Sequence, residues 1–525
     1  MSKPSCRPNR EAIKAQRKER KEAQRELRRT QKAAGLEVPA RVNIPNRTSQ
    51  YKSVEEEKSA RLEAVSQQVK VYRAALPGLL KRLSRITDPR SPRKIKHKLT
   101  VLMIYGILCF AFQMSSRREA GREMTRPMFM ANLRRLFPDL EDLPHHDTLA
   151  RLLERIDVNE IEEAHVEMIR RLIRGKKFLP YLINGCYPVA IDGTQKFTRA
   201  ELWDEECLER KVRSKTGEKQ ASEPEPEPEP ESKKQYYVYV LEANLAFQNG
   251  MVIPLLSEVL SYTEGDNKAR KQDCEQNAFK RLAQRLKKYF PRLPIMVLLD
   301  GLYPNGPVME LCAKNNWDFM IVLKDDSLPT VWEEINGLKA LQNRNRLDRN
   351  WGDRRQHFWW VNDIDYHYLC AQTKKKKKQT VHAVICEESW EEIKPGSTEV
   401  VTRESRHVWL SSQALNRHSV HERCNLGARH RWGIESGILV EKCHGYQYEH
   451  CFSYDWQTMR GYHYLMRLGH TLNVLAQHSY ALTKYVCEFG ARGLIDFVRN
   501  TIAAPWLSAG ELHEIAAAPC QIRLE

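Results

Sequence analysis

The sequence predicts an α/β protein in which a mixed sheet flanked by helices follows an all-helical N-terminal region. Two apolar segments, residues 187–194 and 294–301, each have the pattern of a buried strand that ends in Asp-Gly. Helical periodicity fills residues 71–178 before the first strand, and a further helical segment separates the two strands. A chain of 525 residues is long enough for about two to four domains.

The composition favours a polyanionic partner. The formal net charge is +18, with 41% hydrophobic and 29% charged residues. This excess makes nucleic acid the default partner and an anionic membrane surface the alternative. The longest apolar run, residues 99–114, is shorter than the ~20 residues of a spanning helix, so we expect a buried helix and no membrane partner. The scattered cysteines and the absence of a recognisable secretory signal indicate a cytoplasmic protein with reduced thiols.

Residues 1–70 predict a basic arm that is helical or disordered. Lys and Arg are dense between Lys3 and Lys32, and almost no large apolar side chain is available for packing. The arm is either a sequence-independent grip on phosphates or a solubilising tail. Residues 71–180 predict a helical domain with basic loops that suit DNA binding, but no clear helix-turn-helix pattern identifies the helix that would contact DNA.

The predicted sheet begins with the strand at residues 187–194 and continues in a hairpin around a Gln-Asn-Gly turn. The alternating Glu-Pro tract inside a spacer at residues 221–232 cannot pack, so we expect it to be exposed. The other expected elements are the hairpin strands 236–243 and 251–260, a helix at 267–290, the strand at 294–301, a helix at 306–315 and a strand at 318–324.

Residues 326–406 predict a β-rich insertion. The expected strands are 357–361, 366–371, 380–386 and 406–410. The lysine run 374–378 is expected at a loop tip, either as a solvated turn or as a phosphate contact. Trp359, Trp360 and Trp409 could stack on a flipped base, but their strand context favours core packing. Helices are expected at residues 428–442 and 455–485, followed by a helical C-terminal tail at 486–525.

The helix at residues 428–442 mixes charged and apolar side chains on one face. Arg431, Glu435 and Lys442 are four and seven residues apart, a spacing that places them on one stripe with two aliphatic side chains. Such a stripe suits a helix that presses its carboxylate against a sheet to reach a metal, with cations beside it for phosphates. The alternative is an ordinary Arg-Glu pair on a partly exposed helix.

Two further carboxylates stand at predicted strand ends. Asp192 follows the first buried strand and Asp300 follows the second. Carboxylates at adjacent strand ends can hold two divalent metals roughly 4 Å apart, which activate the attacking oxygen and stabilise the leaving oxygen of a phosphodiester. Hard oxygen ligands with open positions suit Mg²⁺ or Mn²⁺.

With these features the sequence resembles the insertion-sequence transposases of the Asp-Asp-Glu (DDE) class. The branch it resembles has the signature Tyr, two residues, Arg, three residues, Glu, six residues, Lys, and Arg431, Glu435 and Lys442 match that spacing. Ala428 stands where the signature has Tyr, so the contribution of that Tyr is absent or comes from elsewhere. The resemblance covers about residues 187–477.

The resemblance implies a ribonuclease H-like catalytic domain, placed at residues 181–485, with the β-rich insertion before the Glu helix. It implies that Asp192, Asp300 and Glu435 are catalytic and hold two Mg²⁺ or Mn²⁺ ions. It also implies that Arg431 and Lys442 contact DNA phosphates near the cleaved end.

Other residues compete for these roles. Lys324, at a strand end beside the predicted site, is a further candidate for a DNA contact. Glu441 and Glu449 are rivals of Glu435, although Glu441 lies on another helix face from Arg431 and Glu449 lies beyond the helix. The Cys-His and His-Cys pairs within residues 443–451 could be imagined as a zinc site, but their spacing fits no usual ligand pattern.

We therefore expect an enzyme that binds terminal inverted repeats of double-stranded DNA, frees a 3′-hydroxyl and joins it to target DNA. Two protomers are expected to form a homodimer that synapses two ends, and the protein would associate with the nucleoid when bound. The alternatives are a catalytically inactive or domesticated DNA-binding protein, and a nuclease of the same fold that lacks strand transfer.

Overall fold

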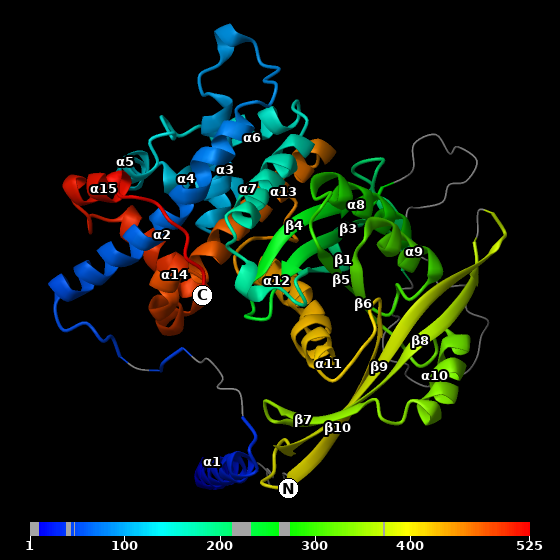
Figure 1. Cartoon of the computed structure of the whole chain (residues 1–525). Helices are drawn as coiled ribbons and strands as arrows, with labels where there is room; N and C mark the ends of the chain where they lie inside the picture. Colours follow the sequence, from blue (N-terminus) through cyan, green and yellow to red (C-terminus); the bar gives the residue numbers. More distant parts are fainter. Residues whose placement is uncertain (1–9, 38–43, 47, 213–232, 262–273, 371–372) are drawn as a thin grey trace, which may run out of the picture. The chain divides into compact units, whose positions relative to one another are not determined.

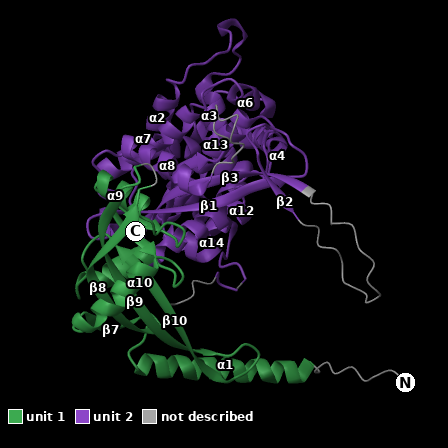
Figure 2. Ribbon diagram, turned by 90° about the vertical axis from the view of Figure 1, so that its right-hand side faces the viewer, with its two compact units in different colours: residues 1–42, 296–428 green, residues 43–295, 429–525 purple. Residues whose placement is uncertain are grey.

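In the computed structural model, which describes residues 10–37, 44–46, 48–212, 233–261, 274–370 and 373–525, the chain folds into two units (Figures 1 and 2). The first unit comprises residues 1–42 and 296–428, and the second comprises residues 43–295 and 429–525. The chain therefore leaves the second unit at the start of the second Asp-Gly strand and returns to it just before the Glu435 helix. The positions of the two units relative to one another are not determined.

The N-terminal region is mostly helical, as the periodicity predicted, and its helices α2 to α7 belong to the second unit. The helix α2 begins after Ser53, whose side chain accepts the N–H of Glu56 and caps the helix. The apolar helix α3 is buried over nearly its whole length and contacts the C-terminal helix α13. The helices of this region are α2 (Val54–Leu83), α3 (Leu99–Ala111), α4 (Arg117–Met124), α5 (Pro127–Leu136), α6 (His146–Leu153) and α7 (Asn159–Arg174).

The strands of the second unit form an antiparallel group in the order β2-β3-β1, with β4 paired to the other part of β3. Their bounds are β1 (Tyr187–Arg199), β2 (Leu208–Val212), β3 (Lys233–Ala246) and β4 (Val252–Val259). The expected hairpin joins β3 to β4, and Gly250 occupies the left-handed position of its turn with φ 84°. The expected helix after it is α8 (Glu275–Tyr289), while residues 262–273 and the Glu-Pro tract lie outside the described residues.

Four helices complete the second unit: α12 (Trp432–Cys443), α13 (Trp456–Gln477), α14 (Thr483–Ala503) and α15 (Ala509–Ala517). The α13 helix is buried along nearly its whole length and contacts α3, α7 and β4, so it forms the centre of this unit. The expected helix at residues 428–442 starts later than the sequence indicated. Residues 422–427 form a π-turn and 428–431 a 3-10 turn, so Arg431 is the N-cap residue of α12.

The first unit contains a mixed sheet, because β5 and β6 are parallel and the other strands are antiparallel. The strand order within this unit is β5-β6-β10-β9-β8-β7. The elements are β5 (Ile295–Leu299), α9 (Gly306–Asn315), β6 (Asp318–Val322), α10 (Pro329–Leu341), β7 (Arg346–Trp351), β8 (Arg354–Leu369), β9 (Lys376–Ile393), β10 (Val400–Ser411) and the short α11 (Ser419–His421).

The β-rich insertion is present, but its strands are longer than the sequence indicated. Residues 357–361 and 366–371 were expected as two strands; β8 instead runs through both, because a bulge at Asp363, with φ 61°, absorbs the polar break. The lysine run is only partly a loop, since β9 starts at Lys376. The helix α10 within the insertion was not expected.

The basic arm contributes α1 (Arg10–Ala33) to the first unit, where α1 contacts β9. Leu27 and Gln31 are its buried residues, and Gln31 Nε2 donates to the carbonyl of Glu391 at 3.2 Å. Most other side chains of α1 are exposed. Among the described residues, no helix combines the length and the apolar character needed to cross a bilayer.

Candidate functional site

Asp192 lies inside β1 rather than at its end. The first five residues of β1 are buried, and Asp192 is the first that is not. The strand then continues to Arg199 because the chain keeps pairing with β3, where Asp192 faces Glu242. The expectation of a turn at Gly193 is therefore wrong. Gly193 is needed for close packing instead, since a Cβ there would overlap Tyr239 and Glu275.

Glu435 reaches the same place from the first turn of α12. Two glycines let α12 lie close to the strands: a Cβ on Gly433 would come within 3.2 Å of Val252, and one on Gly437 within 3.0 Å. The Glu435 side chain keeps 40% of its surface exposed. Its carboxylate is thus held by a packed helix and still open to solvent.

Arg431 joins these two carboxylates. Its Nη1 lies 3.4 Å from Asp192 Oδ2, and its Nη2 donates to Glu435 Oε1 at 2.9 Å. The Arg431 side chain is 7% exposed, and its guanidinium lies over the ring of Trp432, with 4.7 Å from Cζ to the ring centroid. Two acidic side chains that are far apart in the sequence therefore meet at one cation.

Lys442, at the other end of α12, ties the helix to β1. Its Nζ donates to the carbonyl of Gln195 at 3.0 Å and lies 3.0 Å from Glu449 Oε1. Glu449 is therefore the ion-pair partner of a lysine that the signature also contains. The DNA-contact roles of Arg431 and Lys442 stay predictions.

Glu441, the other rival of Glu435, is fully buried. His470 Nδ1 lies 2.7 Å from Glu441 Oε1, and Arg467 Nη1 lies 3.3 Å from both carboxylate oxygens. Burial alone would raise the pKa of Glu441, but Arg467 and His470 bring it below its usual range. This carboxylate fixes α12 to α13, so it is not available to a metal on the exposed side of α12.

Arg467 also pairs with Glu242, the residue opposite Asp192. Arg467 Nη2 lies 3.1 Å from Glu242 Oε2, and the hydroxyl groups of Ser257 and Tyr448 donate to that carboxylate at 2.6 and 2.9 Å. Burial would raise the pKa of Glu242, but the Arg467 charge holds it below its usual range. One arginine thus links the strand beside Asp192 to the helix that carries Glu435.

This buried network was missed by the sequence analysis, although a signal for it exists. His463, Arg467 and His470 are spaced by four and three residues, so they form one polar stripe on an otherwise buried helix. Lys196 extends the network, because its Nζ donates to the carbonyl of Tyr448 at 2.8 Å. Burial lowers the pKa of Lys196 to about 8.

Asp300 and Lys324 lie in the first unit. Asp300 directly follows β5, as expected, and its Oδ1 accepts the N–H of Leu302 at 2.9 Å. The Lys324 side chain lies over Gly301, where a Cβ would overlap its methylene groups. The structure thus brings Lys324 to the turn that holds Asp300, whereas the meeting of Asp300 with Asp192 and Glu435 stays a prediction.

The aromatic candidates fall into two groups. Trp360 and Trp409 are buried, which agrees with the core packing that their strand context favoured. Trp359 is half-buried beneath Lys339, whose Nζ lies 3.7 Å from the ring centroid. Trp432 was not singled out from the sequence, yet it is 60% exposed beside Arg431. An exposed aromatic next to the carboxylates suits contact with a nucleobase better than the buried ones do.

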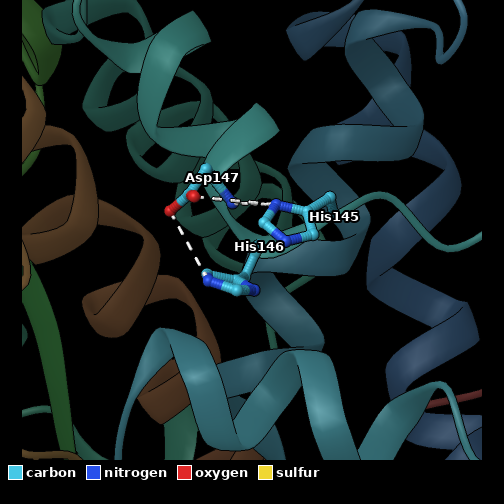
Figure 3. Close-up of side chains that lie close together, drawn as sticks. All are labelled: His145, His146 and Asp147. Atoms are coloured by element: carbon cyan, nitrogen blue, oxygen red, sulfur yellow. Dashed lines mark hydrogen bonds and ion pairs between the residues drawn. The ribbon is translucent and has the colours of Figure 1, made fainter.

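The Cys-His and His-Cys pairs within residues 443–451, whose spacing fits no usual zinc pattern, form no group of ligand atoms among the described residues. Cys451 Sγ instead donates to the carbonyl of Ser453 at 2.9 Å. Within the described ranges, the metal-ligating side chains that do gather are His145, His146 and Asp147, far from this segment in the sequence (Figure 3).

Comparison with known families supports part of this picture. Residues 80–169 match the family model DDE_Tnp_1-associated, a match that indicates a DDE-family transposase and therefore a mobile-element protein. The matched segment runs from the end of α2 into α7 and precedes all three predicted metal ligands. No curated protein matches the chain.

Proposed function

We propose that this protein is a DDE-type DNA transposase with a ribonuclease H-like catalytic domain, which binds transposon ends and catalyses metal-dependent strand cleavage and strand transfer. One observation carries the proposal: Asp192 and Glu435 converge on a single cation, the guanidinium of Arg431. The match of residues 80–169 to a transposase-associated family model supports it independently.

The donor set fits the hard divalent ions that such a reaction needs. Asp192 and Glu435 offer carboxylate oxygens, and Arg431 shows that a positive charge is accommodated between them. Together with Asp300 they would hold Mg²⁺ or Mn²⁺, most simply as two ions. When bound, the ions would activate the attacking oxygen and stabilise the leaving oxygen of the phosphodiester.

The cationic side chains of α12 would position the DNA. If an ion neutralises Asp192 and Glu435, the guanidinium of Arg431 becomes available for a phosphate oxygen, for which its fork of donors is suited. Lys442 lies half-buried between β1 and Glu449, so a small movement would let its Nζ exchange the exposed Glu449 for a phosphate. Trp432, whose ring lies against the Arg431 guanidinium, is 60% exposed and would be open to a nucleobase.

Replacement of Asp192 by Asn tests the proposal. The variant keeps the shape of the side chain but removes one anionic oxygen donor, so DNA binding should persist and Mg²⁺-dependent nicking should vanish. The assay uses DNA that carries the ends of the element as substrate, with Glu514→Gln, an exposed carboxylate of α15, as a matched loss of one carboxylate. Nicking by Asp192→Asn at the rate of the unmodified protein would contradict the assignment.

The same assay separates the two alternatives. A DNA-binding protein that has lost catalysis would bind the ends without nicking them at any metal concentration. A nuclease of this fold would nick the ends but would not join pre-cut ends to a target plasmid, whereas a transposase joins them.

A further inference from the structure

A second group of metal-ligating side chains lies outside the carboxylate site, at the start of α6 (Figure 3). His145, His146 and Asp147 each offer a ligand atom, and these atoms all lie within 4.8 Å of one another. His145 is the N-cap residue of α6, and the other two are its first residues. In Figure 3 both imidazole rings lie beside the carboxylate of Asp147.

The distances are close to those of a bound transition metal. His145 Nδ1 lies 3.7 Å from Asp147 Oδ2, and His146 Nε2 lies 3.6 Å from Asp147 Oδ1. Two ligand atoms on a tetrahedral Zn²⁺, each at about 2.0–2.1 Å from the ion, are about 3.4 Å apart. The two imidazole nitrogens approach different oxygens of Asp147, so one oxygen would have to serve both. With one ligand atom from each residue, the three atoms lie within 4.8 Å of one another, so the widest pair would have to close by at most about 1.4 Å.

The orientation of His146 is fixed by the neighbouring helix α4. A Cβ on Gly121 would come within 2.9 Å of His146 Nδ1, so a larger residue at position 121 would require the ring to shift. Nδ1 of His146 thus faces Gly121, while Nε2 faces Asp147. The ring is placed by packing rather than by a free rotamer.

Binding of a metal ion by these side chains would break two existing contacts of His145 and Asp147. His145 Nδ1 accepts the N–H of Asp147 in a long bond of 3.3 Å, and Arg117 Nη1 lies 3.6 Å from Asp147 Oδ1. Both separations exceed those of strong hydrogen bonds, so a metal–ligand bond would replace weak interactions. The side chain of His145 is 65% exposed, which leaves access for an ion and room for water as a further ligand.

We propose that His145, His146 and Asp147 form a zinc-binding site with two imidazoles, one carboxylate and an open position. Imidazole nitrogens favour Zn²⁺ over Mg²⁺, so this site would take a different ion from the carboxylate site. The ion would hold the start of α6 against α4 and add positive charge beside Arg117. The site lies within the segment that matches the transposase-associated family model, but it does not depend on catalysis by the chain.

The test is a titration of the full chain, freed of metal and kept reduced, with Zn²⁺ and with Co²⁺ as a spectroscopic probe. His145→Ala is the main variant, because its exposed side chain can be removed without disturbing the contact with Gly121. The control is His513→Ala, an exposed histidine of α15. We expect His145→Ala to lose one equivalent of bound Zn²⁺ and the corresponding Co²⁺ absorption band, while the control retains both.

The titration measures Zn²⁺ binding alone, so its result does not depend on whether the protein is a transposase. Equal zinc stoichiometry in the unmodified protein and in His145→Ala would overturn it, as would an unmodified protein that binds no Zn²⁺. The same titration in the Asp192→Asn variant should still show the equivalent that depends on His145. A failure of the carboxylate assignment would therefore leave this result unchanged, and the converse also holds.

Discussion

At the scale of single residues, two arginines set the electrostatics around the candidate site in different ways. Arg431 lies next to carboxylates that are partly open to solvent, so its pairing with them can be exchanged for an ion. Arg467 lies between Glu242 and Glu441 where all three side chains are buried, so its pairing is permanent. The first arrangement suits binding, and the second suits the support of a binding site.

Replacing Arg467 by Met tests that supporting role. The variant would leave two buried carboxylates without their cation, and loss of one partner of a buried pair costs about 3–5 kcal/mol of folding free energy. Calorimetry should show a clearly lowered melting temperature. Lys484→Met breaks the exposed pair with Glu63 and should cost less than about 1 kcal/mol. Equal effects of the two substitutions would contradict the supporting role.

The same substitution should change the dependence of stability on pH. The folded-state pKa values of Glu242 and Glu441 lie below their usual range, so their contribution is present above the unfolded-state pKa of about 4.3. That contribution is lost as the pH falls through the folded-state values. In Arg467→Met the Coulombic cause of the lowering is gone, so the loss of stability on acidification should be smaller.

At the scale of elements, α12 can lie close to β4 because two of its residues are glycines and carry no side chain. Gly433 and Gly437 face the side chain of Val252, and a Cβ at either position would require Val252 or α12 to move by a few tenths of an ångström. Glu435 lies between these two glycines in the sequence, so a shift of α12 moves its carboxylate relative to Asp192.

Gly437→Ala is therefore expected to affect catalysis more than folding. The added Cβ meets the Val252 side chain at 3.0 Å, so Val252 or α12 has to move by a few tenths of an ångström. A movement of α12 displaces Glu435, and the cleavage rate should then fall about 10-fold, given that a 1 Å misplacement can cost ~100-fold. Gly337→Ala, on an open face of α10, is the matched control; it should stabilise the fold by about 0.5–1 kcal/mol and leave cleavage unchanged. Undiminished cleavage by Gly437→Ala would contradict the account of α12.

Most elements could be predicted from the sequence, because their hydrophobic periods are strong. The helical N-terminal region, the β3–β4 hairpin, β5, α9 and β6 follow from such periods. The continuation of β1 through Asp192-Gly193 could not be predicted, because it depends on pairing with a strand far along the chain. The passage of β8 through Asp363 likewise depends on a bulge that its neighbour β9 accommodates.

For the candidate site, too, contacts within one helix could be predicted from the sequence, whereas contacts between distant segments could not. Spacing within one helix predicted that Arg431 and Glu435 share a face, and the structure confirms their contact. The approach of Asp192 to Arg431 is a contact between distant segments, and the local pattern offered only the strand-end Asp as a hint. Burial of Glu441 could not be read from α12 alone, because it is caused by Arg467 and His470 on α13.

At the scale of the whole molecule, the chain distributes the three predicted metal ligands between two units. Asp192 and Glu435 belong to the second unit, and Asp300 belongs to the first. The proposal that all three carboxylates hold metal ions therefore requires donors from both units.

The most direct test of whether Asp192, Asp300 and Glu435 form one metal site is a Mn²⁺ titration of the chain without DNA. The binding is measured by calorimetry and by the electron paramagnetic resonance signal of free Mn²⁺. The substitutions compared are Asp192→Asn, Asp300→Asn and Glu435→Gln, with Glu449→Gln as the control. If one site uses all three carboxylates, each of the three substitutions weakens Mn²⁺ binding and any double substitution adds little further loss. Mn²⁺ binding by Asp300→Asn that equals that of the unmodified protein, while Asp192→Asn loses it, would contradict the central claim.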